Sequence, residues 1–292
     1  MEILRSLLFI PSVSIKMLDK INMLKPDGFI LDLEDSIPAN QKEHARQNIS
    51  RSLKNLTISK KIFVRTNDLD SQLYKNDIKE TICEKVAGFV IPKFENILKL
   101  KEVINFVESE ENKAGINAGS IKIILMIESA RGIIELNKFE QLKENTSRIM
   151  ALTIGWEDFS RDIMVFSEIS EAMLDYIRFQ ILLFSKAYDC LAIDTIYKEF
   201  KDSVGLEKQV SKIAHMGFNG KLAIHPSQIE IINCGFLPSK VEFEKMNRLL
   251  ENRQRIEKEG AVSINGVMYD PPHLKLALKI KEYIDNINMK II

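Results

Sequence analysis

Short apolar runs alternate along the chain with polar clusters and with longer segments of helical spacing. Eight of these runs are mostly rich in Ile, Val, Leu or Phe and are continuously apolar, which is typical of strands buried on both faces of a parallel sheet. They cover Leu4–Ile10, Gly28–Leu33, Ile62–Val64, Gly88–Ile91, Ile121–Ile127, Ile149–Thr153, Cys190–Ile193 and Lys221–Ile224. The pattern therefore predicts eight β-strands.

The segments between the runs indicate helices, for example over Ser14–Lys25, Ile97–Ser109 and Glu171–Lys186. Strands that alternate with helices predict β/α units, and eight units close a TIM (β/α)₈ barrel of roughly 250 residues. The alternative is an open doubly wound sheet, which usually has a glycine-rich turn after its first strand. The segment after Ile10 reads "PSVSIK" and has no glycine. We therefore expect the α/β TIM barrel.

Two further helical segments, Ser239–Lys258 and Pro271–Asn286, follow the eighth run. The stretch "EGAVSINGVMYDPP" separates them, and its "INGV" is a plausible hairpin turn. We divide the chain into a barrel catalytic domain over residues 1–236 and a C-terminal helical extension over 237–292. Two roles are open for the extension: a structural cap, or a lid over a neighbouring site.

Composition excludes several partners. The 41 basic and 41 acidic residues give no net charge, whereas a protein that binds nucleic acid without sequence preference needs a basic excess. No apolar stretch approaches the roughly 18 residues of a membrane-spanning helix. The apolar stretch Met1–Pro11 is short and lacks a positively charged leader and a cleavage site, so we expect no secretory signal. The three widely spaced cysteines fit a reducing compartment better than a disulfide framework. We expect a cytoplasmic protein.

Acidic side chains gather where the predicted strands end, and the ends of barrel strands meet around one mouth. They are Asp32, Glu34 and Asp35 at the end of the second run, Glu128 after the fifth, Glu157 and Asp158 after the sixth, and Asp194 after the seventh. Such a group repels itself unless positive charge lies within it, and Arg65, Lys93 and a divalent cation are candidates. Oxygen ligands without a His/Cys cluster favour Mg²⁺ or Mn²⁺, with Glu128 and Asp158 as the natural pair. The alternative is that these acids are helix N-caps and first-turn charges.

Two further residues at the strand ends favour a binding site. Gly155 lets the backbone approach a ligand and exposes the following N–H groups to a carboxylate. Arg65 offers a forked donor to a carboxylate or an oxyanion, and its alternative role is a structural ion pair with Asp32 or Glu34. His225 also lies at a strand end, but no nearby Ser or Cys gives it the setting of a catalytic triad.

Nine motifs in fixed order resemble a known family: "RSLLFIPSVSIKML", "DGFILDLEDSIP", "VRTN", "FVIPKFEN", "IESARGI", "GWEDFSRDI", "AIDTIY", "GFNGKLAIHPSQI" and "NGVMYDPP". Over about Leu4 to Leu278 the chain is similar to the citrate lyase β-subunit and malyl-CoA lyase group of the HpcH/HpaI aldolase superfamily. Two departures stand in the first motif. Ser12 replaces a usual glycine and Ser14 an arginine of some relatives, which bears on CoA binding more than on metal chemistry.

The resemblance implies a Mg²⁺-dependent carbon–carbon lyase, with Mn²⁺ as the alternative metal, acting on a 3-hydroxyacyl thioester. Malyl-CoA, citramalyl-CoA and citryl-CoA or citryl-carrier protein are the candidate substrates, and a 2-keto acid and an acyl thioester are the products. The implied partners are thus a small 2-keto or 2-hydroxy acid and acyl-CoA or an acyl-carrier protein. A homo-oligomer, trimer or hexamer, is also expected. The second hypothesis is a non-catalytic or regulatory barrel subunit that binds thioesters.

The resemblance also implies roles for single residues. Glu128 and Asp158 match the metal ligands, and Arg65 the residue that binds the keto-acid oxygen. The other correspondences are Glu34 and Asp35 as outer acids, Gly155, Trp156, Glu157 and Asp158 as the cradle of the small acid's carboxylate, Lys16 at the CoA phosphates, and Asp270 as the acid/base residue donated to a neighbouring subunit. An ordinary aspartate is a poor acid at neutral pH, so we expect burial to raise the pKa of Asp270.

Overall fold

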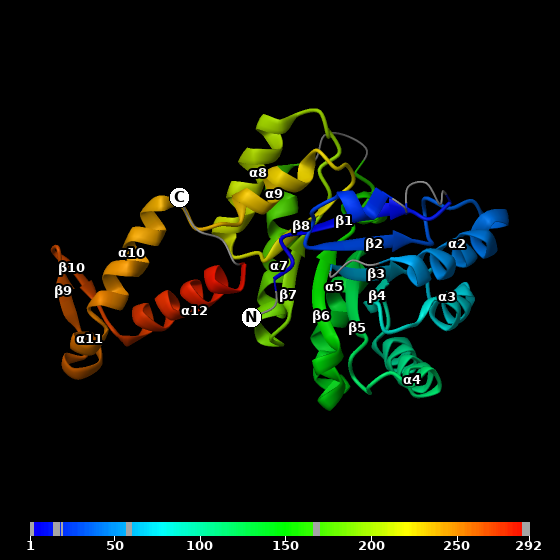
Figure 1. Cartoon of the computed structure of the whole chain (residues 1–292), viewed down its shortest axis with the longest axis horizontal. Helices are drawn as coiled ribbons and strands as arrows, with labels where there is room; N and C mark the ends of the chain where they lie inside the picture. The colour runs from blue at the N-terminus through cyan, green and yellow to red at the C-terminus, as the bar shows by residue number, and fades with distance from the viewer. Residues whose placement is uncertain (1–2, 14–17, 19, 57–59, 166–169, 288–292) are drawn as a thin grey trace. The chain divides into compact units, whose positions relative to one another are not determined.

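The computed structural model describes residues 3–13, 18, 20–56, 60–165 and 170–287. Eight parallel strands close into a barrel in sequence order, with the last strand paired to the first (Figure 1). Each predicted apolar run overlaps one strand, so the TIM barrel is confirmed and the open sheet is wrong. The strands are β1 (Ser6–Pro11), β2 (Gly28–Asp32), β3 (Lys61–Arg65), β4 (Val86–Ile91), β5 (Lys122–Ile127), β6 (Ile149–Ile154), β7 (Leu191–Asp194) and β8 (Gly220–Ala223).

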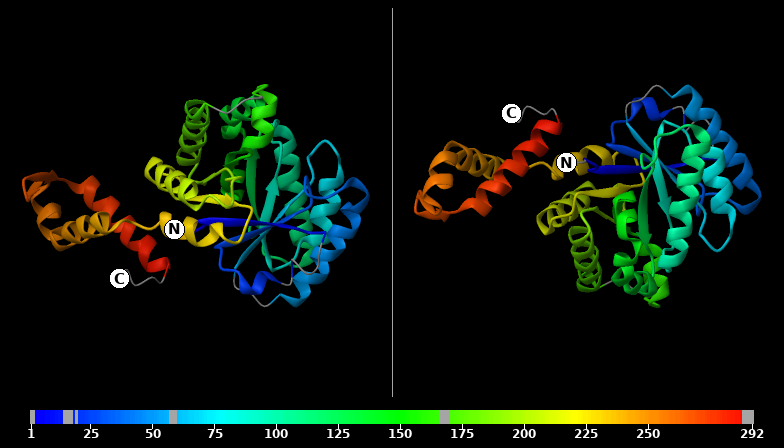
Figure 2. Two further views of the ribbon diagram at one scale, coloured as in Figure 1. Left: turned by 90° about the horizontal axis from the view of Figure 1, so that it is seen from above. Right: turned by 90° about the horizontal axis from the view of Figure 1, so that it is seen from below.

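Helices follow the strands and lie around the barrel (Figure 2). The helix predicted from Ile97 continues past Ser109 and ends at Gly115, whose positive φ of 69° suits a glycine helix end. Much of the predicted helix over Ser14–Lys25 lies outside the described residues. The barrel helices are η1 (Lys20–Met23), η2 (Ala39–Gln41), α2 (Lys42–Asn55), α3 (Leu73–Thr81), α4 (Ile97–Ala114), α5 (Ala130–Glu135), η3 (Leu136–Arg148), α6 (Trp156–Asp162), α7 (Glu171–Ala187), α8 (Ser203–Met216) and α9 (Gln228–Gly235).

The barrel interior is a packed apolar core, because every strand turns one set of alternate side chains inward. Members of this core come from all eight strands or their immediate starts, among them Phe63, Ile124 and Leu222. Replacing a buried Phe by Ala costs about 3–5 kcal/mol. This packing holds the strand ends in place, and the strand ends carry the site.

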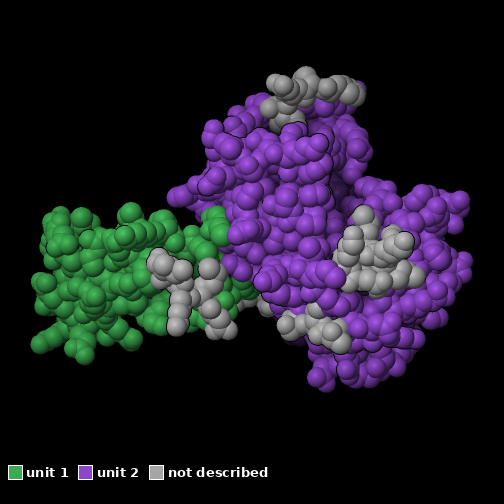
Figure 3. Space-filling view, turned by 45° about the horizontal axis from the view of Figure 1, so that its top comes forward, with its two compact units in different colours: residues 1–3, 234–292 green, residues 4–233 purple. Residues whose placement is uncertain are grey.

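By contacts between residues, the chain divides into a unit over residues 4–233 and a second unit over 1–3 and 234–292 (Figure 3). The second unit has a small core of its own, built from α10 (Lys240–Glu251), α11 (Arg253–Glu259), β9 (Val262–Ile264), β10 (Val267–Tyr269) and α12 (Pro271–Ile287). The helix predicted over Ser239–Lys258 is in fact two, which meet at Asn252. The predicted hairpin is present, and positive φ at Asn265 and Gly266 (52° and 78°) suits its turn. The roles of catalytic domain and lid stay predictions.

Among the described residues, no helix is long and apolar enough to cross a membrane.

Candidate functional site

A cavity of about 410 Å³ lies at the carboxyl ends of the barrel strands, where a TIM barrel carries its chemistry. Many of the predicted site residues line it. Its charged lining consists of the Arg65 guanidinium and the carboxylates of Asp32, Asp35, Glu128, Glu157 and Asp158. The strand-end acids of β2, β5 and β6 thus converge on one cavity, as the sequence predicts.

Arg65 is held in place by its neighbour on β2. The strand register sets Asp32 beside Arg65, and the guanidinium donates two hydrogen bonds to that carboxylate, from Nε to Oδ1 at 2.6 Å and from Nη2 to Oδ2 at 2.8 Å. Burial alone would raise the pKa of Asp32, but the charge and hydrogen bonds of Arg65 outweigh it and lower that pKa. The ion pair weighed as an alternative is therefore present, and Arg65 lines the cavity as well.

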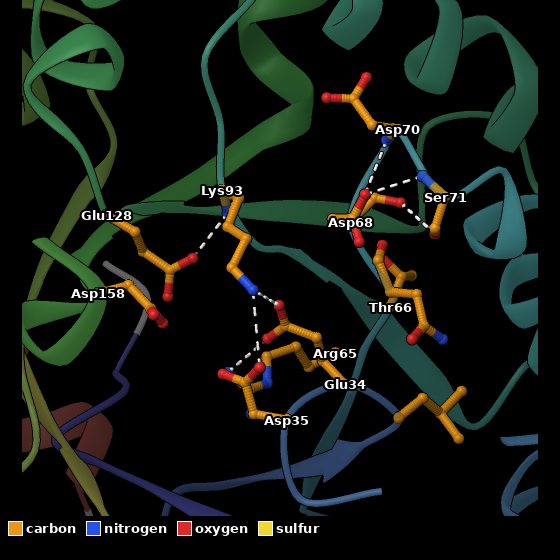
Figure 4. Close-up of polar contacts among 12 residues, drawn as sticks. Glu34, Asp35, Arg65, Thr66, Asp68, Asp70, Ser71, Lys93, Glu128 and Asp158 are labelled. Atoms are coloured by element: carbon orange, nitrogen blue, oxygen red, sulfur yellow. Dashed lines mark hydrogen bonds and ion pairs between the residues drawn. The ribbon is translucent and has the colours of Figure 1, made fainter. Parts of the chain in front are cut away.

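Lys93 links the acids of two strand ends (Figure 4). Its ammonium lies 2.7 Å from Glu34 Oε1, and its backbone N–H donates to Glu128 Oε2 at 2.8 Å. Arg65 Nη1 lies 2.9 Å from Glu34 Oε2. Burial raises the pKa of Glu34 even so. Asp35 lies at the edge of this group, about half exposed and 3.6–3.7 Å from the two cations.

Glu128 is a buried acid for which no described cationic side chain forms an ion pair. Burial raises its pKa to about 8, and the nearby Glu34 carboxylate adds to the effect. Gly155 gives its side chain room, because a Cβ at this position would lie 2.2 Å from Glu128 Oε1. The Gly155 N–H is bonded to the carbonyl of Ile127, which fixes the two strand ends together. This glycine therefore makes space for the acid's carboxylate.

Asp158 lies in the first turn of α6 and points toward the space beside Glu128 (Figure 4). It pairs with Arg161 at 2.8 Å, and Glu157 pairs with Lys198. Trp156 is buried and stacks on Phe159 with ring centroids 5.8 Å apart. The backbone N–H of Trp156 donates to Thr195 Oγ1 at 3.4 Å, so one backbone N–H of the predicted carboxylate cradle already has a partner.

Asp194 does not join the other strand-end acids. It is fully buried between Arg178 of α7 and Lys221 of β8, at 2.8 Å and 2.7 Å, and does not line the cavity. The prediction that Asp194 joins the carboxylates at the barrel mouth is therefore wrong. The residue before it, Ile193, belongs to the barrel core, so Asp194 points to the opposite side of the strand. The feature of the sequence that could indicate this buried pairing is the presence of Arg178 and Lys221 within otherwise apolar segments.

Asp270 lies in the second unit at the start of α12, and its side chain is 43% exposed. A hydrogen bond from His273 lowers its pKa, so the raised pKa expected for this residue is not found in the single chain. The sequence motifs did not point to His273, although its spacing of three from Asp270 at a helix start predicts contact. Lys16 lies outside the described residues.

Glu128 and Asp158 are the carboxylates that suit a divalent cation. No group of three or more His, Cys, Asp or Glu side chains within the described part of the chain is arranged to hold a metal. Magnesium needs only one or two protein carboxylates, since water and substrate oxygens complete its shell. A buried acid with a raised pKa, for whose carboxylate Gly155 makes room, and a second acid that lines the same cavity fit such an ion.

A closed β/α barrel with acids and an arginine at the carboxyl ends of its strands is the architecture of a barrel enzyme. Residues 5–226 match the model of the HpcH/HpaI aldolase/citrate lyase family. The chain belongs to this family, as the motifs predict.

Relatives cover nearly the whole chain. It is 31% identical to the citrate lyase subunit beta of Haemophilus influenzae, over 97% of both chains. It is also 31% identical to the mitochondrial citramalyl-CoA lyase of Homo sapiens, over 95% of this chain and 86% of the relative. Its fold is similar to that of protein CitE from Mycobacterium tuberculosis, solved with magnesium, acetoacetate and coenzyme A, with a TM-score of 0.76 and 23% identity over 95% of this chain and 97% of CitE. Both relatives at 31% identity are named as lyases or lyase subunits.

Proposed function

We propose that this protein is a divalent-metal-dependent carbon–carbon lyase that cleaves a 3-hydroxyacyl thioester into a 2-oxo acid and an acyl thioester. The observation that carries the proposal is the meeting of Glu128, Asp158 and Arg65 at one cavity in a barrel of this family. The lyase names of the two relatives at 31% identity support it, as does the presence of magnesium and coenzyme A in the CitE structure.

Glu128 and Asp158 would hold the metal, with Mg²⁺ the ion that their oxygen ligands favour. When bound, such an ion supplies Lewis acidity and a template for the carboxylate and adjacent oxygen of the substrate. Of the chain's own groups, Arg65 would stabilise negative charge on the oxygen that becomes the oxo group. Asp32 would keep its guanidinium in place by the two hydrogen bonds described above.

The reaction also requires proton transfer. As the carbon–carbon bond breaks, the substrate hydroxyl loses one proton and the acyl thioester leaves as an enolate that gains one, so the overall reaction neither consumes nor releases a proton. We assign the second transfer to Asp270, acting in the site of a neighbouring subunit. Its lowered pKa in the single chain means that a change of surroundings, such as burial on a partner, would be needed to keep it protonated.

Mg²⁺-dependent release of a free oxo acid from malyl-, citramalyl- or citryl-CoA tests the proposal. Replacing Glu128 or Asp158 by Ala should abolish the dependence on divalent cations, and persistence of that dependence would refute the ligand pair. Asp270→Asn should lower turnover by about 10²–10⁴-fold while leaving metal binding intact. Unchanged turnover would remove Asp270 from the mechanism.

The alternative is a thioester-binding barrel without catalysis. It would bind the CoA esters and release no oxo acid under any of these conditions.

A further inference from the structure

Apart from its charged groups, the cavity is lined largely by apolar side chains. Phe9 and Met126 come from β1 and β5, and Ile154 from β6. Ile196, Leu222 and Ile224 come from β8 or from the ends of β7 and β8. This wall would accept an uncharged group and offers no partner to a charged one.

Within the described part of the chain, the cationic side chains at and near the cavity are paired with the chain's own acids. Arg65 donates two hydrogen bonds to Asp32, and its Nη1 lies 2.9 Å from Glu34. Its remaining N–H groups are those proposed above for the oxo oxygen. Nearby, Lys93 pairs with Glu34, Arg161 with Asp158, and Lys198 with Glu157. Against the single lining guanidinium stand five lining carboxylates. A divalent ion would take up the substrate's first carboxylate and still leave this cavity negative.

The candidate oxo acids differ only in the group on the oxo carbon, which is hydrogen in glyoxylate, methyl in pyruvate and carboxymethyl in oxaloacetate. A second carboxylate would have to be buried among like charges, where each of the described cationic side chains named above already faces an acid of the chain, which is unfavourable. Hydrogen or methyl would meet the apolar wall instead. Resting on the proposed function, we infer that the oxo acid handled here carries a single carboxylate and a small uncharged substituent. The substrates are therefore malyl- or citramalyl-type thioesters rather than citryl-type ones.

Overall similarity does not make this choice, because a citrate lyase subunit and a citramalyl-CoA lyase are each 31% identical to the chain. The choice between the substrate types rests instead on the side chains that line the cavity.

Binding of the free acids tests the inference without turnover. Calorimetry on the full chain with Mg²⁺ should show pyruvate or glyoxylate binding at least about tenfold more tightly than freshly prepared oxaloacetate. Oxaloacetate binding equally or more tightly would overturn the inference. If none of the three acids binds, the proposed site is itself wrong.

A charged substitution on the apolar wall sharpens the test. Ile224 is 39% exposed, so a lysine there should be compatible with folding. Ile224→Lys should strengthen oxaloacetate binding relative to pyruvate by at least about tenfold, whereas the matched uncharged variant Ile224→Met should keep the wild-type order. An unchanged ratio in Ile224→Lys would show that charge does not exclude the second carboxylate.

Turnover separates the substrate preference from the lyase function itself. The wild-type protein should cleave malyl- or citramalyl-CoA at least about tenfold more efficiently than citryl-CoA, as kcat/KM. A preference for citryl-CoA would overturn the inference and leave the lyase proposal standing. Cleavage of none of the three, with pyruvate or glyoxylate binding retained, would overturn the lyase proposal instead.

Discussion

Two ionic clusters lie at the ends of barrel strands and differ in how their charges are balanced. The mouth cluster, formed by Asp32, Glu34, Arg65, Lys93 and Glu128, has more acids than bases. The buried cluster, formed by Arg178, Asp194 and Lys221, has one fully buried acid between two bases, and the partly exposed Asp175 also pairs with Arg178. Every charge of the buried cluster has a partner of opposite charge within the chain, while the one partner that the described residues give to the Glu128 carboxylate is the backbone N–H of Lys93. The buried cluster is therefore structural, and the mouth cluster suits a cation from outside.

The largest expected difference is in activity. Glu128→Gln keeps the shape of the side chain but removes its charge, so Mg²⁺-dependent turnover should fall by more than about 100-fold. Because the ionised acid is unfavourably buried, the stability of the metal-free protein should not fall. Paired measurements of turnover and denaturant unfolding check both statements, and a variant that unfolds readily would show that Glu128 is a structural acid.

The buried cluster should respond in the opposite way. Asp194→Ala removes the carboxylate of fully buried Lys221 and the buried partner of Arg178, which keeps only Asp175 at 3.1 Å, and should lower the free energy of unfolding by about 3–5 kcal/mol. The matched surface variant is Asp285→Ala, which removes an exposed partner of Lys281 on α12 and should cost less than about 1 kcal/mol. Equal losses in the two variants would contradict the structural role.

The two clusters should also give opposite dependences of stability on pH. The pKa of Glu128 is raised from 4.5 to about 8, so its contribution is fully present below pH 4.5 and is lost as the pH rises toward 8. Although burial alone would raise the pKa of Asp194, Lys221 and Arg178 lower it below 3.8. The contribution of Asp194 is therefore present above 3.8 and lost at more acidic pH.

Denaturant unfolding at a series of pH values, without metal, measures both effects. Glu128→Gln should flatten the loss between pH 4.5 and 8, and added Mg²⁺ should offset that loss in the wild type because it binds the ionised carboxylate. A wild-type profile that is flat over this interval would argue against the raised pKa.

The smallest effect is expected at the edge of the cavity, where Lys198 pairs with Glu157. Because the lysine side chain is 56% exposed, Lys198→Ala should change the free energy of unfolding by less than about 1 kcal/mol. Thermal or denaturant unfolding checks this value. A loss comparable to that of Asp194→Ala would mean that the two kinds of ion pair do not differ as their burial suggests.

Periodicity and strand-end position made much of the fold and cavity predictable. The apolar runs located all eight strands, and the acids after β2, β5 and β6 do converge. Two details could not be read from the runs. The break between α10 and α11 at Asn252 interrupts a segment whose helical pattern continues across it. Asp194 ends its strand as Asp32 does. Because side chains alternate along a strand and Ile193 points into the barrel core, Asp194 points away from that core.

The order of strands, the closed barrel and the family follow from the sequence itself, because each depends on local periodicity or on motifs that are contiguous in the chain. The pairing of charges does not. Asp194 meets Lys221 across 27 positions of sequence, and Glu34 meets Lys93 across 59. Only the tertiary structure decides which acids are neutralised within the chain and which, like Glu128, are left for a ligand, because ion pairing depends on distances that closure of the barrel sets.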